Sequence, residues 1–176
     1  MNASRYDGTA IALHWTGALL ILAGAGLGLT MVGLPLTPEK LRLYAWHKWI
    51  GITVFLVALA RLAWRWYAPP PAYPATMARW QARAARLVQA LLYTLMLAIP
   101  VSGWLYSSST GVSVSYLGVV PLPNLVPKDK ALASALLVLH QSLNALLGAV
   151  VLLHVAAAMK HRFVDRDGVL GRMLPP

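Results

Sequence analysis

Imidazole rings are the strongest potential metal ligands in this sequence, which contains five histidines and no cysteine. Two of them, His140 and His154, stand at the ends of an apolar run that has no charged residue. Their spacing of fourteen residues corresponds to about 1400° of helical rotation, close to four full turns. On one helix both rings therefore point to the same side, roughly 21 Å apart along the axis.

Four apolar segments provide helices long enough to hold such residues in a bilayer. Hydrophobic residues make up 59% of the 176 residues and charged residues only 11%. The segments lie at approximately 11–34, 46–66, 87–106 and 130–159. About 20 apolar residues span the hydrocarbon core of a membrane. The sequence therefore predicts an all-α integral membrane four-helix bundle that forms a single domain, 1–176.

The basic residues predict how this bundle is oriented. Ten of the 15 Lys and Arg residues lie in the N-terminal segment, the second link and the C-terminal tail, and five lie in or beside the first and third links. Because positive charge favours the cytoplasmic side, we expect both termini in the cytoplasm. Lipid headgroups and topology explain the net charge of +10 better than nucleic acid does.

This orientation sorts four histidines into two levels. His14 and His154 lie at the cytoplasmic level, and His47 and His140 at the outer level. Zinc needs about four protein ligands, or three and a water, and the five acidic residues all lie outside the apolar runs. A porphyrin needs only two axial groups. We therefore predict two b haems, one between His14 and His154 and one between His47 and His140.

Two arginines share the helical stripe of His47. Arg61 and Arg65 follow it by fourteen and eighteen residues, which places them at the depth of the inner haem. They are candidates to bind its propionates, although arginines at helix ends also extend to lipid headgroups. The six-coordinate iron predicted here has no open position for oxygen, which favours electron transfer over oxygen activation.

Gly28 and His161 are the remaining candidates. Gly28 follows His14 by fourteen residues and offers room at the outer level, either for a macrocycle or for close helix packing. His161 lies seven residues after His154, about 10 Å further along the helix. A ring there is too far out for the inner iron. It is either solvated or a contact for a quinone or a propionate.

Two connecting segments have patterns of their own. Residues 73–86 are basic and amphipathic, which indicates an interfacial segment before the third helix. Residues 107–127 are rich in Ser, Gly and Pro, and there Val112, Val114 and Tyr116 alternate with serine. This alternation favours a short extended piece on the surface.

Several motifs together resemble one known family, the bacterial cytochromes b561, which also includes the b subunits of nickel hydrogenases. The matching segments are Ala12-Leu-His14-Trp15, Trp46-His47-Lys48-Trp-Ile-Gly51, Arg61-Leu-Ala-Trp-Arg65, Ala98-Ile-Pro100-Val-Ser-Gly103, Leu139-His140-Gln, Leu153-His154-Val-Ala-Ala-Ala and the tail ending Leu170-Gly-Arg-Met-Leu-Pro175. The resemblance covers nearly the whole chain.

The resemblance implies a four-helix dihaem cytochrome of the bacterial inner membrane that exchanges electrons with ubiquinone. Stand-alone members resemble a superoxide:ubiquinone oxidoreductase, which takes electrons from superoxide at the outer haem. By position, His161 matches a quinone-contacting histidine of that family. In the third helix this chain departs from its relatives, because Arg86 and Gln89 occupy positions where they carry histidines.

Two other functions remain open from the sequence. One is an electron-relay and anchor subunit that links a peripheral dehydrogenase or hydrogenase to the quinone pool, with another small electron donor or a redox subunit as its partner. The other is a haem-free transporter or metal carrier. The haem content of the purified protein separates the last of these from the first two.

Overall fold

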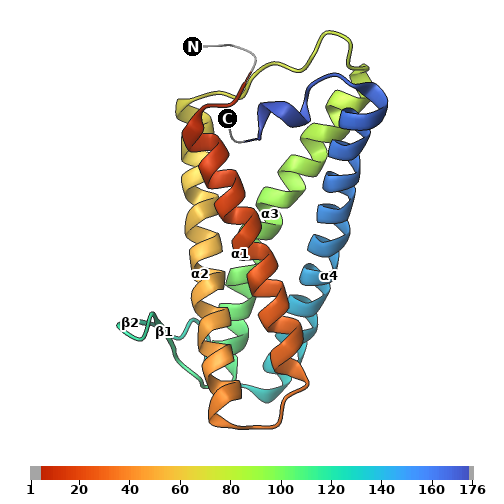
Figure 1. The fold of residues 1–176 in the computed structure, drawn as a ribbon. Helices are drawn as coiled ribbons and strands as arrows, with labels where there is room; N and C mark the ends of the chain where they lie inside the picture. Colours follow the sequence, from red (N-terminus) through yellow and green to blue (C-terminus); the bar gives the residue numbers. More distant parts are fainter. Residues whose placement is uncertain (1–4, 175–176) are drawn as a thin grey trace.

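The structure is a computed structural model that describes residues 5–174. Four long helices run antiparallel in sequence order: α1 (Gly8–Val32), α2 (Pro38–Tyr67), α3 (Arg79–Ser109) and α4 (Lys130–Lys160) (Figure 1). Each is long and apolar enough to cross a membrane. The predicted four-helix membrane bundle is therefore confirmed, and the first and last described residues, Arg5 and Leu174, lie at the same end of it (Figure 1).

The second and third helices begin earlier than the sequence predicted, because each includes polar residues that precede its apolar part. The α2 helix begins at Pro38 rather than Trp46, because the Thr37 hydroxyl accepts a hydrogen bond from the Lys40 N–H (3.3 Å) and proline suits the first helical position. The α3 helix begins at Arg79 rather than Leu87, so much of the basic segment before it is helical. Pro100 lies within α3.

Asp7 connects the start of α1 to the end of α2. Its carboxylate accepts hydrogen bonds from the Ala10 N–H (3.0 Å) and from the Trp64 indole N–H (3.0 Å). Burial raises the pKa of the Asp7 carboxyl, but these hydrogen bonds outweigh burial and hold it below its ordinary value. The charged carboxylate therefore holds the start of α1 and the end of α2 together.

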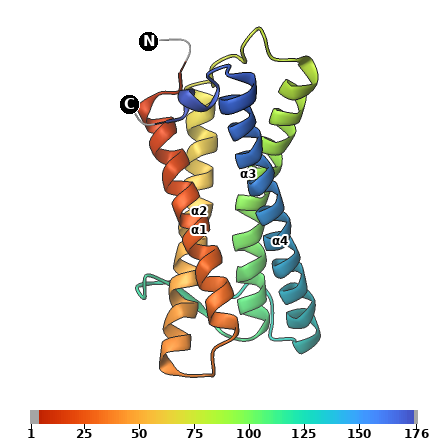
Figure 2. The same ribbon diagram turned by 45° about the vertical axis from the view of Figure 1, so that its right-hand side comes forward.

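The bundle consists of two helical hairpins joined between α2 and α3. The α1 helix packs mainly on α2 and the α3 helix mainly on α4, as the two views in Figures 1 and 2 show. Two small apolar clusters fill the middle: Val54, Ala58 and Met96 form one, and Leu95, Leu147 and Val150 form the other. Both clusters lie between the outer and inner histidine levels.

The outer link after α3 folds into a small hairpin beside α2. Strand β1 (Val114–Tyr116) pairs antiparallel with β2 (Val120–Leu122). The Trp49 indole N–H on α2 donates to the Ser115 carbonyl (2.7 Å), and the Thr53 and Tyr116 hydroxyls are 3.0 Å apart. The short extended piece expected around Val114 is confirmed.

At the other end, the tail folds back over the bundle. A π-helical turn (His161–Asp165) extends α4, and a 3-10 turn (Leu170–Arg172) follows it. Arg172 donates to the Ala72 carbonyl (2.6 Å), and the Trp15 indole N–H donates to the Met173 carbonyl (2.8 Å). The tail is therefore fixed to both α1 and the link between α2 and α3.

Candidate functional site

Four histidines from three helices meet as two pairs at opposite ends of the bundle. The ring centroids of His14 on α1 and His154 on α4 are 6.3 Å apart. The ring centroids of His47 on α2 and His140 on α4 are also 6.3 Å apart. The structure thus brings together the histidines that share a depth in the sequence pattern, with α4 contributing one ring to each pair.

The separation within each pair matches two axial ligands of one metal. A metal–imidazole nitrogen bond is about 2.0–2.1 Å, and the ring centre lies about 1 Å further back, so two rings on opposite sides of one metal have centroids roughly 6 Å apart. Within residues 5–174, α1 and α4 hardly touch through their backbones although they supply the inner pair. Two such rings across separated helices suit a flat group between them.

The outer pair has its ring nitrogens arranged for ligation. The Nδ1 atom of His47 lies 2.9 Å from the Gly24 carbonyl, and Nδ1 of His140 lies 3.2 Å from the Ile99 carbonyl and 2.9 Å from the Ser102 hydroxyl. A carbonyl only accepts, so Nδ1 carries the proton in both rings. The Nε2 lone pairs are therefore available to a metal, and the ring orientations are fixed from behind.

At the inner pair, Arg61 holds His14 in the other tautomer. A guanidinium nitrogen of Arg61 lies 3.2 Å from Nδ1 of His14, and because arginine only donates, that nitrogen accepts and Nε2 carries the proton. A metal at Nε2 requires the proton to move to Nδ1 and Arg61 to leave it. The guanidinium also lies over the Tyr93 ring, 5.2 Å from its centroid.

Glycines make room for the outer pair. A Cβ atom on Gly28 would lie 3.3 Å from Cε1 of His47, and one on Gly103 would lie 3.1 Å from Cε1 of His140. Both distances are tighter than ordinary van der Waals contact. Glycine at position 28 therefore leaves space for the His47 ring of α2, which a larger side chain would crowd.

Arg65 lies apart from Arg61, in a separate cavity of about 230 Å³ beyond the inner histidine pair. This cavity is also lined by Arg86 and Gln89, where the family resemblance led us to expect histidines, together with Tyr6 and Tyr73. Burial raises the pKa of Tyr6, although Arg65 opposes that rise. The two predicted propionate arginines therefore face different surroundings.

His161 is largely buried and held by acids rather than solvated. Its Nδ1 atom lies 2.7 Å from Asp167 and 3.3 Å from Asp165. Among the residues that the structure describes, these three form the only group of three or more His, Asp or Glu side chains close enough to share an ion. Asp165 is already paired with Lys160 (2.6 Å), so the cluster is best described as an ion-paired turn.

Sequence reasoning missed the groups behind the outer rings. Ser102 and the carbonyls of Ile99 and Gly24 make the hydrogen bonds that orient His140 and His47. Every residue has a backbone carbonyl, so residue types do not indicate which carbonyls will accept from a histidine ring. Ser102, next to Gly103, was the one side chain in the sequence that could have indicated a hydrogen-bond partner for His140.

The geometry defines a class of protein: a four-helix membrane protein with a bis-imidazole site near each end. The profile of one family, described as prokaryotic cytochrome b561, matches residues 5–176. The chain belongs to the prokaryotic cytochrome b561 family. Membership implies that it is a multi-pass bacterial membrane protein that binds haem b and transfers electrons.

Three relatives match nearly the whole chain. Cytochrome b561 homolog 2 of Escherichia coli (strain K12) is 32% identical over 177 residues, which is 97% of this chain and 91% of the relative. Cytochrome b561 homolog 1 of the same strain is 28% identical over 174 residues, 98% of each chain. A probable superoxide oxidase CybB of Yersinia pestis is 25% identical over 175 residues, 97% of this chain and 96% of the relative.

Proposed function

We propose that the chain is a dihaem cytochrome of the bacterial inner membrane that oxidises superoxide at its outer end and reduces ubiquinone at its cytoplasmic end. Two superoxide anions give up one electron each to form two oxygen molecules, and one ubiquinone takes up both electrons and two protons. His14 and His154 would hold one haem and His47 and His140 the other, and the haem irons supply the one-electron chemistry. The two 6.3 Å ring pairs carry this proposal.

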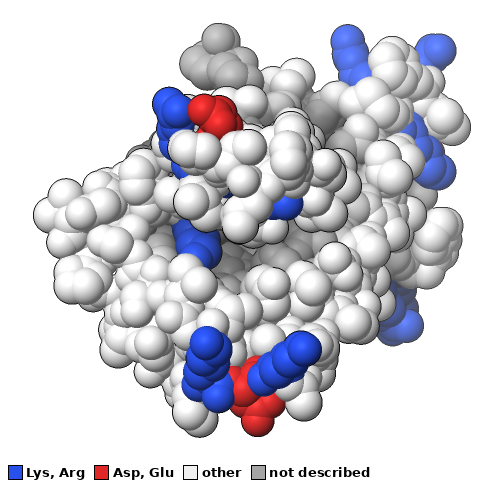
Figure 3. Space-filling model, turned by 90° about the horizontal axis from the view of Figure 1, so that it is seen from below, with Lys and Arg blue, Asp and Glu red and all other residues white. Residues whose placement is uncertain are grey.

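The outer end suits a small anionic substrate. Figure 3 shows this face from below, with basic side chains around a hollow near its centre. Lys48 follows His47 directly, and its ammonium donates to the Ser107 hydroxyl (2.8 Å). Ser107 lies about one helical turn after Gly103 in α3. Within residues 5–174 it forms no ion pair with a carboxylate. An unpaired, half-buried cation beside the outer pair would attract superoxide.

The cytoplasmic end supplies groups for the haem edge and the quinone. If a haem is bound, Arg61, which now donates to His14, would be free to pair with a propionate, and Arg65 would do so from its own cavity. His161 would contact the quinone. The Asp167 carboxylate, which lies 2.7 Å from the His161 Nδ1 atom, would orient the ring toward the quinone.

The spectrum of the purified protein tests the proposal as a whole. A reduced-minus-oxidised difference spectrum with a haem determination is expected to give two b haems per chain. Superoxide generated in the presence of ubiquinone should then yield ubiquinol in a ratio of two superoxide anions to one ubiquinol. A chain without haem, or one with two haems that leaves superoxide untouched, contradicts it.

Replacing Lys48 by glutamine should slow the reaction with superoxide and leave both haems in place. Removing one cation beside the site is expected to lower kcat/KM for superoxide about 3- to 10-fold and to flatten its dependence on ionic strength. Stopped-flow measurements at several salt concentrations check both effects. Lys130→Gln removes the same charge from an exposed outer position and serves as the control. Equal losses in both variants would show that only net charge matters.

A further inference from the structure

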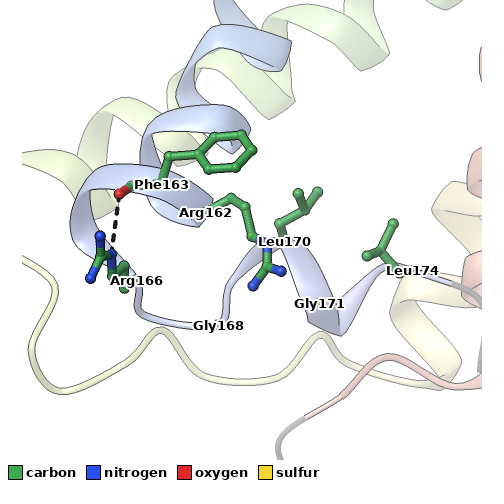
Figure 4. A pocket seen from close by; sticks show the side chains of 7 residues that line it. All are labelled: Arg162, Phe163, Arg166, Gly168, Leu170, Gly171 and Leu174. Carbon is green, nitrogen blue, oxygen red and sulfur yellow. Dashed lines mark hydrogen bonds between the residues drawn. The ribbon is translucent and has the colours of Figure 1, made fainter.

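A second cavity, separate from the histidine pairs, lies under the folded-back tail at the cytoplasmic end. It has a volume of about 530 Å³ and is lined by Arg162, Phe163, Arg166, Gly168, Leu170, Gly171 and Leu174 (Figure 4). In Figure 4 the Arg162 side chain extends toward Leu170, whereas Arg166 stands at the opposite edge. The cavity therefore combines apolar walls with two guanidiniums.

The chain folds so that this cavity stays open. The π-helical turn ends at Arg166, whose φ is +51°, and Gly168 follows with φ +74°. These two left-handed residues reverse the chain. The tail beyond them is tied down by Arg172 at the Ala72 carbonyl and by a hydrogen bond from Arg5 to the Leu174 carbonyl (2.6 Å). The wall carrying Leu170 and Leu174 is thus held at both ends.

The acids of this segment are used by other partners. Asp165 pairs with Lys160 and Asp167 with His161. Within residues 5–174, Arg162 and Arg166 have no carboxylate partner, and the only hydrogen bond found for Arg166 goes to the Phe163 carbonyl (3.4 Å). Two guanidiniums four residues apart therefore face the cavity with their charge uncompensated.

The surroundings place the cavity at the level of lipid headgroups. Large aromatic side chains are exposed at the same end of the bundle, including Trp66 (88%), Tyr67 (81%), Trp80 (67%) and Phe163 (67%). Such residues gather at the membrane interface. Basic pockets of membrane proteins on the cytoplasmic side bind acidic lipid headgroups, which that leaflet displays.

We propose that this cavity binds one acidic glycerophospholipid of the cytoplasmic leaflet, with its phosphate diester between Arg162 and Arg166 and an acyl chain against Phe163, Leu170 and Leu174. Guanidinium groups bind phosphate oxygens in a bidentate manner. The apolar walls distinguish this ligand from free phosphate, and the paired arginines distinguish it from a zwitterionic lipid. The site does not depend on the number or the ligands of the haems.

Lipid titration of the full-length protein, followed by native mass spectrometry, tests the proposal. We expect one phosphatidylglycerol to bind per chain in preference to phosphatidylcholine. The double variant Arg162→Gln/Arg166→Gln should weaken that binding about 10- to 30-fold, as expected for two basic residues at an acidic lipid surface. Arg79→Gln/Arg83→Gln, which removes two exposed arginines outside the cavity at the same end, should leave it unchanged.

Two further arms identify the ligand. Millimolar inorganic phosphate should not displace the lipid, and Phe163→Ala should weaken phosphatidylglycerol binding without changing binding of phosphate. Displacement by phosphate, displacement by a short-chain ubiquinone, or equal losses in the two double variants would each overturn the proposal. Because lipid mass is the readout, these outcomes are independent of electron transfer, and an unchanged haem spectrum verifies that the variants are folded.

Discussion

Replacing His140 by alanine should leave one haem per chain instead of two. The outer pair loses a ring whose centroid lies 6.3 Å from that of His47, and no other histidine lies at that end of the bundle. Superoxide-dependent reduction of ubiquinone should fall by more than about 100-fold, beyond the 10- to 100-fold typical of losing an outer-shell partner. Haem content, the difference spectrum and ubiquinol formation measure the result.

Three related variants make this prediction specific. His47→Ala should have the same spectrum as His140→Ala, because each removes half of one site. His154→Ala should remove the other haem, so that the two single-haem spectra add up to the spectrum of the parent. His161→Ala makes the same change beyond the inner pair, at a histidine outside both pairs, and should retain both haems. A His140→Ala protein with two haems would show that the pairing by depth is wrong.

A larger side chain at Gly103 should have the second-largest effect, through the same ring. A Cβ there already lies 3.1 Å from Cε1 of His140, and the ring cannot easily retreat because Ile99 and Ser102 hold its Nδ1 atom. Overpacking of this kind costs about 1–3 kcal/mol. We therefore expect Gly103→Val to weaken the outer haem about 10- to 100-fold, as misdirecting a metal ligand does.

Glycines with open surroundings provide the controls for Gly103. A Cβ atom on Gly148 of α4 would meet no atom within 4 Å, and neither would one on Gly26, two residues from Gly28. Gly148→Val should keep both haems, whereas Gly28→Ala should weaken the outer one by less than Gly103→Val. Haem retention during dilution and the thermal midpoint distinguish the series. Equal behaviour of Gly103→Val and Gly148→Val would contradict the steric explanation.

The sequence predicted the histidine pairs well because their geometry depends on helix periodicity and depth alone. A spacing of fourteen residues and the alternation of helix direction place His154 with His14 and His140 with His47. Family membership and the four-helix bundle follow from the same long apolar segments and motifs. The roles of these four residues as haem ligands remain predictions.

Contacts that depend on tertiary packing could not be predicted in this way. The hydrogen bond between Arg61 and His14 joins residues forty-seven positions apart, and the Ile99 carbonyl behind His140 has no side-chain signature. The early start of α2 was missed because hydropathy outweighed the Thr37-Pro38 capping signal. The tail cavity needs the left-handed Arg166, a residue type that rarely adopts that conformation.

The two histidine pairs share helix α4. The α1 helix supplies a ring only to the inner pair and α2 only to the outer pair, but α4 carries a ring of each. A cofactor bound at either end would restrict the rotation and sliding of α4 and so would remove part of the entropy cost of binding at the other. Loading of the two sites is therefore expected to show positive cooperativity, even though roughly 21 Å of helix separates the two rings on α4.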